Sequence, residues 1–140
     1  MKYNLERFLD AQQRCFDNAY EEIRTGYKRG CWMWYIFPQL QALGQSSTSI
    51  YYGIRDLKEA QAYLAHPILS KRLYTMTRLL LNLNTNCALE VFGYPDDMKL
   101  HSCMTLFHIA SKEDKHGPFM KVIDKFFDGE LDKNTIKLLK

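Results

Sequence analysis

The stretch "LERFLDAQQRCFDNAYEEI", residues 5–23, decides the fold class, because its apolar residues recur every three or four positions. With charged residues between them, that spacing places the apolar side chains on one face of an α-helix. The stretch therefore predicts an amphipathic helix that begins near Asn4 and ends near Gly26. The residues of this face are Leu5, Phe8, Leu9, Phe16, Ala19, Tyr20 and Ile23.

Helical signals continue through most of the chain. Asp56 and Glu59 occupy capping-box positions of a helix that ends before Pro67, with His66 as its terminator. An apolar stripe over residues 69–83 predicts the next helix. Further helices are expected at residues 86–92 with Asn86 as cap, from Asp96 or Asp97 to Ala110, from Gly117-Pro118 to Gly129, and from the cap Asp132 to Leu139.

The composition fits one helical domain. Alternation of period two, which is typical of strands, is nearly absent outside residues 31–37. A chain of 140 residues, 46% of them hydrophobic and 25% charged, can bury most of its apolar surface in a single core. We therefore expect an all-α, compact, multihelical protein with a single helical domain over residues 1–140.

The charge and the cysteines exclude several classes of protein. A net charge of +3 is too mild for a protein held to nucleic acid by phosphate neutralisation. The charged start lacks the apolar segment of a signal peptide, and no apolar stretch approaches the ~20 residues of a membrane span. The four cysteines, Cys15, Cys31, Cys87 and Cys103, lie far apart, which favours free thiols in a reducing, cytoplasmic setting.

The stretch "KRGCWMWYIFPQLQALG", residues 28–44, holds both tryptophans next to a basic doublet. As a strand it would place Trp32 and Trp34 on one face, whereas as a helix it would point them in different directions. Large rings of this kind pack in a core. The other interpretation is that Trp32, Trp34 or Tyr35 lines a cleft, with Lys28 and Arg29 beside it to hold phosphate.

Polar groups gather a second time in "FGYPDDMKLHSCMTLF", residues 92–107. Paired acids suit a helix N-terminus, and short hydroxyls on a helix bond to the preceding turn. The same residue types also fit chemistry, with Asp97 as an acid–base residue and Lys99 and Ser102 as ligand contacts. Cys103 falls on the apolar stripe and is expected to be buried, and the histidines have no zinc-ligand spacing.

Serines stand before a short helix in "GQSSTSIYYGI", residues 44–54. They suit turn and N-cap hydrogen bonds, and the alternative is that Ser49 and its neighbours hold an anion. The chain contains no phosphate-binding glycine motif. We expect no cofactor and no metal.

Four motifs in order resemble the bacterial domain-of-unknown-function family 1810, some members of which carry the label calpastatin. They are "WMWYIFPQL" (residues 32–40), "YLAHPILSKRL" (63–73), "FGYPDDMKLHSCMTLF" (92–107) and "FFDGELDKNTIKLL" (126–139). The resemblance covers nearly the whole chain and implies a multihelical single domain. It implies no activity. The family usually has His directly before the first Trp, where this chain has Cys31.

A fainter likeness links the chain to NADAR (YbiA-like) proteins, which act on N-glycosidic bonds of ADP-ribosyl or pyrimidine-nucleotide compounds. It is carried by the order of the aromatic motif, the helix "EAQAYLAHPILSKRL" (residues 59–73) and the tail "KFFDGELDKNTIKLL" (125–139). The acidic-histidine-aromatic signature of those proteins is not recognisable here. A likeness of fold alone does not transfer function.

These patterns lead to a hypothesis of a pocket for a nucleotide-like or sugar-phosphate-like small molecule, with hydrolysis by an N-glycosidase-like reaction as an extension. The proposed acid–base residue is Asp97. The proposed ligand-binding residues are Lys28, Arg29, Trp32, Trp34, Tyr35, Gln39, Ser49, Lys99 and Ser102. The alternative is a helical interaction module without chemistry, which would carry an exposed apolar patch. A third hypothesis, nucleic-acid binding, needs exposed stacking rings along a basic groove and ranks last. No membrane partner is expected.

Overall fold

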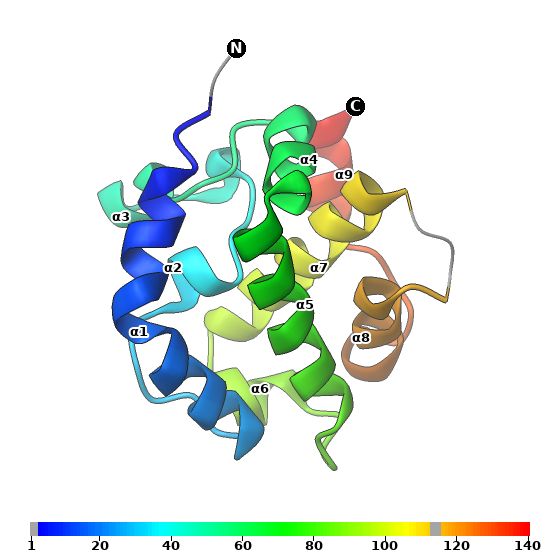
Figure 1. Ribbon diagram of the computed structural model, residues 1–140. Helices are drawn as coiled ribbons and strands as arrows, with labels where there is room; N and C mark the ends of the chain where they lie inside the picture. The colour runs from blue at the N-terminus through cyan, green and yellow to red at the C-terminus, as the bar shows by residue number, and fades with distance from the viewer. Residues whose placement is uncertain (1–2, 113–115) are drawn as a thin grey trace.

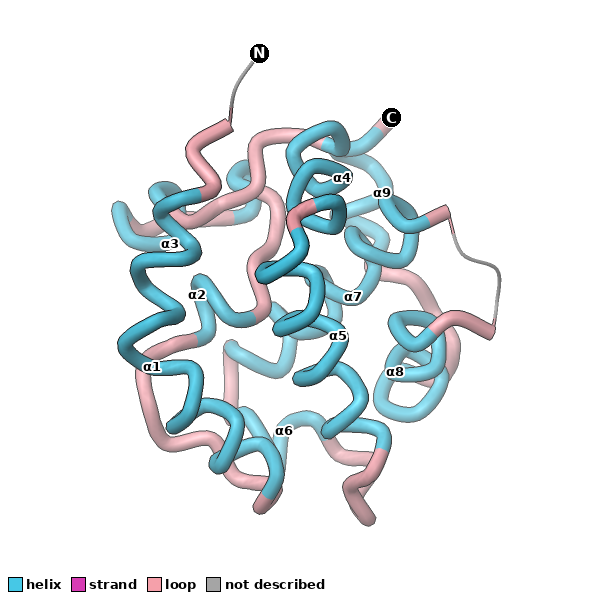
Figure 2. The backbone as a smooth tube through the Cα atoms, viewed as in Figure 1, coloured by secondary structure: helices cyan, strands magenta, loops and turns pink. Residues whose placement is uncertain are grey.

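Helix α7 (Asp96–Ser111) lies at the centre of the molecule, and helices α4, α6, α8 and α9 contact it (Figure 1). The computed structural model describes residues 3–112 and 116–140. Within these ranges the chain forms helices joined by loops and no strand, so the expected all-α class is confirmed (Figure 2). Among the described residues, the β-type contact is an isolated bridge that pairs Leu40 with Ile54.

The other elements follow one another at the positions that the helical periodicity predicts, with short additions in the first half of the chain. In chain order they are α1 (Glu6–Arg24), α2 (Met33–Ile36), the 3₁₀ turn η1 (Gln41–Leu43), α3 (Ser47–Tyr51), α4 (Leu57–Ala65), α5 (Pro67–Leu81), α6 (Ala88–Phe92), α8 (Pro118–Phe127) and α9 (Lys133–Leu139).

Aromatic rings connect four helices through the core. Phe8 of α1 meets Tyr63 of α4 edge to face, with ring centroids 5.2 Å apart. Tyr63 lies 5.2 Å from Phe107 of α7, which lies 6.1 Å from Phe119 of α8. All four rings are fully buried. Because each ring removes ~150–250 Å² from water, this row accounts for much of the packing that holds the helices together.

Helix α7 is buried around most of its circumference. The face predicted from the sequence, which includes Leu100, Met104 and Phe107, is buried as expected, and so is Cys103. The neighbouring helices also cover Thr105 and Leu106, which the sequence leaves outside that face. The first and last turns of α7 keep an accessible side, and the polar residues of the first turns face a surface.

Side chains cap several helices where the sequence indicates a start. Asp56 accepts the backbone N–H of Glu59 at 2.9 Å, and Asp132 accepts that of Thr135 at 3.0 Å. One expectation is wrong: Asn86 does not cap α6, which begins after Cys87. His66 ends α4 as expected, and it also begins α5, because its Nδ1 accepts the first free backbone N–H groups of α5.

The aromatic run forms the short helix α2, so its interpretation as a strand is wrong. Trp32 stands immediately before this helix and is buried, whereas Trp34 lies within it and is half-buried. Side chains two residues apart on a helix point in directions that differ by about 200°, which explains why the two indoles lie in different surroundings.

None of the helices in the described residues combines the length and the apolar character that crossing a membrane requires.

Candidate functional site

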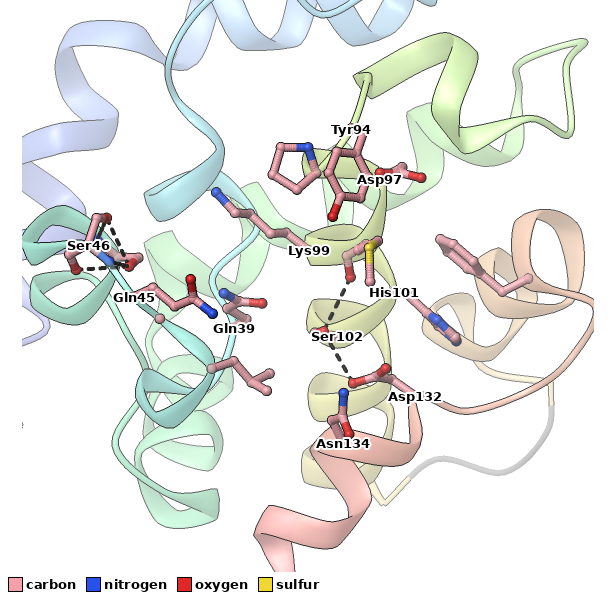
Figure 3. A pocket seen from close by; sticks show the side chains of 16 residues that line it. Gln39, Gln45, Ser46, Tyr94, Asp97, Lys99, His101, Ser102, Asp132 and Asn134 are labelled. Atoms are coloured by element: carbon pink, nitrogen blue, oxygen red, sulfur yellow. Dashed lines mark hydrogen bonds between the residues drawn. The ribbon is translucent and has the colours of Figure 1, made fainter.

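A cleft of about 730 Å³ with both polar and apolar lining opens over the N-terminal half of α7. One wall is the segment from Gln39 to Ser49, and the other is the start of α9 with the end of α8 (Figure 3). Its lining is rich in amides, hydroxyls and charged groups. The polar and aromatic members are Gln39, Gln45, Ser46, Ser49, Tyr94, Asp97, Lys99, His101, Ser102, Phe127, Asp132 and Asn134.

The backbone bridge between Leu40 and Ile54 holds the first wall. The N–H of Gln41 donates to Ile54 O at 2.7 Å, and the N–H of Ile54 donates to Gln39 O at 2.8 Å. Gly53 makes this approach possible, since a Cβ there would lie 2.3 Å from the Cα of Gln41. The wall is therefore attached to the body of the protein by backbone contacts.

Ser46 and Ser49 form a capping box at the start of α3. The backbone N–H of Ser49 donates to Ser46 Oγ at 3.1 Å, and that of Ser46 donates to Ser49 Oγ at 3.0 Å. The turn and N-cap interpretation of these serines is therefore confirmed. Ser49 also borders the cleft, where its hydroxyl is already engaged in this local network.

Ser102 and Asp132 meet in the opposite wall. Ser102 Oγ lies 3.2 Å from Met98 O and 3.2 Å from Asp132 Oδ2, so it contacts both the preceding turn of α7 and the cap of α9 (Figure 3). Asp132 Oδ2 also accepts the hydroxyl of Thr135 at 2.6 Å. This oxygen is thus fixed by several donors, which holds the carboxylate of Asp132 in one orientation beside the cleft.

Lys99 connects the cleft with the aromatic run. Its Nζ lies 5.4 Å from the ring centroid of Trp34 and 3.5 Å from Asp96 Oδ1. The other oxygen of Asp96 pairs with Lys28 Nζ at 2.8 Å. Asp96 therefore stands between two ammonium groups, and these contacts bring the two polar regions of the sequence together.

Asp97 lies at the rim of the cleft beside Tyr94 and points to the side opposite Lys99 (Figure 3). Its Oδ1 is buried and has no hydrogen-bond partner in the part of the chain that the structure describes. Such an oxygen loses its hydration without compensation. Asp97 is therefore a carboxylate of the cleft with unused hydrogen-bonding capacity.

His101 and Phe127 form a flat aromatic pair on the flank of α7 away from Gln39. Their rings are stacked, with centroids 4.1 Å apart and planes inclined by 7°. His101 Nε2 lies 2.6 Å from Glu130 O, which holds the imidazole in place. On this side of the cleft, a ligand would meet a rigid aromatic surface, because the imidazole nitrogen Nε2 is already engaged.

Five of the predicted ligand-binding residues are not part of the cleft lining, and one of them, Trp34, contacts the cleft residue Lys99. Trp32 is buried, and its indole N–H donates to Glu22 at 2.9 Å. Lys28 pairs with Asp96 and is largely buried, while Arg29 is exposed and stacks on Tyr27. These residues have structural partners, which explains why they are not turned toward the cleft.

Tyr35 is another predicted ligand-binding residue that lies outside the cleft. It packs edge to face with Tyr52 at a centroid distance of 5.0 Å. Burial, with the neighbouring Cys15 thiol, raises the pKa of the Tyr35 hydroxyl to about 12. Cys31, which stands where the resembled family usually has His, is exposed and also lies outside the cleft lining.

Of the predicted set, the structure brings Gln39, Ser49, Asp97, Lys99 and Ser102 to the cleft, with Trp34 behind Lys99. Sequence reasoning missed several lining residues because their roles depend on how distant segments meet: Gln45, Tyr94, His101, Phe127, Asp132 and Asn134. The sequence predicts Asp132 as a helix cap but does not predict its place in the cleft. No group of His, Cys, Asp and Glu in the described ranges is arranged to hold a metal.

The fold is that of a compact, all-helical single domain with a cleft over α7. Residues 2–139 match the family model described as "Protein of unknown function (DUF1810)", and the chain belongs to that family. It is similar to the conserved hypothetical protein Rv1873 from Mycobacterium tuberculosis, whose crystal structure matches with 44% identity and a TM-score of 0.93. The match covers 98% of this chain and 96% of that one. Comparison with curated proteins finds no match.

Proposed function

We propose that the cleft binds a small nucleotide-like or sugar-phosphate-like molecule. The observation that carries this proposal is the convergence of Gln39, from the segment before η1, with Lys99 and Ser102 of α7 on one cleft of about 730 Å³. Cavities of ~300–1,000 Å³ with a few convergent polar groups are typical of small-molecule sites.

The lining groups divide into two kinds of contact. Lys99 is a cation at the edge of the cleft, and its side chain retains 23% exposure, so it can meet a phosphate. Asp132, Asn134 and Gln39 supply carboxylate and amide groups, which suit the hydroxyls of a sugar because a hydroxyl both donates and accepts. A ligand that combines a sugar with one phosphate satisfies both kinds.

Hydrolysis of an N-glycosidic bond is the second candidate function, and the presence of two carboxylates, Asp97 and Asp132, in the cleft lining favours it. A carboxylate can take a proton from water as the water attacks the sugar carbon, while the base leaves with a proton from solvent. Asp132 is the other carboxylate of the cleft. Comparing Asp97→Asn with Asp132→Asn separates the two residues in this reaction.

Binding of ribose 5-phosphate, AMP and ADP-ribose, measured by thermal unfolding and calorimetry, tests the proposal. A ligand at 100 times its dissociation constant stabilises the folded state by about 2.7 kcal/mol. Lys99→Met and Asp132→Asn should weaken binding, and the second keeps a good helix cap. Lys121→Met, at an exposed position on α8, is the matched control and should bind as the wild type does.

Chromatographic detection of free adenine after incubation with AMP or ADP-ribose, with ribose 5-phosphate as the second product from AMP, tests hydrolysis separately. If the nucleotides bind but no base is released, the binding proposal stands and the proposal of hydrolysis is wrong. If none of the three phosphates binds, the binding proposal is wrong. The helical interaction module then becomes the preferred description.

A further inference from the structure

A narrow crevice adjoins the cleft and leads to Trp34. Its lining includes the aromatic residues Trp34, Phe37 and Tyr52. Gln39, Ser49 and Lys99 line both the crevice and the cleft, so these three side chains form the boundary between the two. The crevice has a volume of about 10 Å³, which is room for roughly one water molecule.

Lys99 occupies the place from which a ligand would reach the indole. Its Nζ lies 5.4 Å from the centroid of the Trp34 ring, in a cation–π contact. Such a contact contributes only ~0.5–1 kcal/mol at an accessible site. The ammonium group therefore covers the indole without a strong attachment to it.

The second contact of Lys99 is also weak. Asp96 pairs with Lys28 at 2.8 Å and with Lys99 at 3.5 Å, so one carboxylate serves two cations and holds Lys28 more closely. The side chain of Lys28 is 9% exposed, against 23% for Lys99. Of the two, Lys99 is the lysine that can turn toward an anion in the cleft.

We propose that Trp34 and Lys99 together select a ligand in which a flat aromatic ring accompanies the phosphate, that is, a mononucleotide in preference to a sugar phosphate. The proposal rests on the function proposed above and specifies its ligand class. The phosphate draws Lys99 away from Trp34, and the ring of the ligand then stacks on the uncovered indole. In the complex, stacking of the base on Trp34 replaces the cation–π contact between Lys99 and Trp34.

The position of Trp34 supports this exchange. It is half-buried, so the protein fixes one part of the ring and leaves another accessible. Trp32, by contrast, is 2% exposed and is held through its N–H by Glu22. Stacking of a base on an aromatic side chain contributes about 1–3 kcal/mol, which corresponds to about 5- to 150-fold in affinity.

Calorimetry with ribose 5-phosphate and AMP tests the proposal. In the wild type AMP should bind about 5- to 150-fold more tightly than ribose 5-phosphate. Trp34→Leu should remove this difference by weakening AMP alone, and Trp34→Phe, which keeps a ring, should retain most of it. Lys99→Met should weaken both ligands, because both carry the phosphate.

Tryptophan emission provides a second measurement that needs no variant at Trp34. AMP should quench the emission of the wild type by stacking, whereas ribose 5-phosphate should not. If both phosphates bind equally well and neither quenches emission, the selection by Trp34 is wrong while the cleft remains a binding site. If Trp34→Leu does not fold, Trp34→Phe and the wild-type emission still decide between these outcomes.

Discussion

Glu22 Oε1 accepts the indole N–H of Trp32 at 2.9 Å and, at 2.7 and 2.8 Å, the backbone N–H groups of Arg29 and Gly30. One carboxylate oxygen of α1 thus holds both the buried indole and the turn that precedes it. Gly30 allows this close arrangement, since a Cβ there would lie 2.8 Å from the Trp32 ring. The aromatic run is fixed to α1 at this point, which sets where α2 and Trp34 begin.

Glu22→Ala should lower the free energy of unfolding by about 1–3 kcal/mol, because it leaves the buried N–H of Trp32 without an acceptor. Urea unfolding measures this change. Glu21→Ala is the matched control, since Glu21 forms an exposed ion pair with Arg24 and should cost less than about 1 kcal/mol. Equal losses in the two variants would contradict the role given to Glu22.

The contribution of Glu22 to the free energy of unfolding should depend on pH. Burial raises the pKa of this carboxyl, but the hydrogen bonds from Gly30, Arg29 and Trp32 outweigh it, and the pKa lies below its ordinary value of 4.5. The unfolded chain therefore takes up the proton first as the pH falls. The stabilisation is present above about pH 4.5 and is lost as the pH falls through the folded-state pKa.

Urea unfolding of the wild type and Glu22→Gln between pH 3 and pH 7 tests this dependence. The variant keeps an acceptor oxygen and does not titrate. The difference in stability between the two proteins should shrink toward the acidic end. A difference that stays constant over this range would show that Glu22 titrates alike in the folded and unfolded chains.

The four thiols should react at very different rates with iodoacetamide. Cys31 and Cys87 are exposed, whereas burial raises the pKa of the Cys15 and Cys103 thiols and so lowers their thiolate fractions. We expect rapid alkylation of Cys31 and Cys87, slower alkylation of half-buried Cys15, and alkylation of Cys103 only after unfolding. Peptide mass spectrometry over time measures each rate. Early modification of Cys103 would contradict its place in the core.

The ion pair of Arg7 with Glu59 should be essential to the attachment of α1 to α4. The two groups are 3.0 Å apart, with side-chain exposures of 7% and 3%. Removing one partner, in Arg7→Met or Glu59→Leu, leaves a buried charge and should cost about 3–5 kcal/mol. The double variant should cost less than the sum of the single ones, as measured by urea unfolding. Additive losses would mean that the two charges do not interact.

Sequence periodicity was sufficient for the helices but not for the direction of each polar side chain. A helix face is encoded locally, so α1, α5 and α8 follow from spacing alone. In the aromatic run the local pattern fits a strand and a helix equally well. In the structure the run forms helix α2, and Trp32 is bound by Glu22 of α1, a residue ten positions away. Trp34 instead contacts Lys99, so the two indoles lie in different environments.

The cleft shows the same limit. Lys28 and Lys99 each lie in one of the two stretches that the sequence marks as candidate site regions. Only the tertiary structure makes Lys28 a buried partner of Asp96 and Lys99 a residue of the cleft. Asp132 is recognisable as a helix cap. That its carboxylate also meets Ser102, thirty residues away, depends on how α9 packs against α7.

Gly53→Ala should deform the first wall of the cleft. A Cβ at this position would lie 2.3 Å from Gln41 Cα and 3.0 Å from Gln41 N, so the backbone on one side of the Leu40–Ile54 bridge must move. The amides of Gln41 and Ile54, which form the two hydrogen bonds of the bridge, should lose protection against hydrogen exchange by tenfold or more, the equivalent of about 1.4 kcal/mol.

Gly26→Ala is the matched control for this variant. Gly26 has a φ of +85° and lies at the end of α1, where the nearest contact of a new Cβ would be 3.6 Å away, so substitution strains the backbone without disturbing the cleft. Both variants should lower the free energy of unfolding, but only Gly53→Ala should expose the two bridge amides and weaken binding of AMP. If Gly53→Ala leaves exchange at Gln41 and Ile54 unchanged, the bridge is not what holds Gln39 in the wall of the cleft.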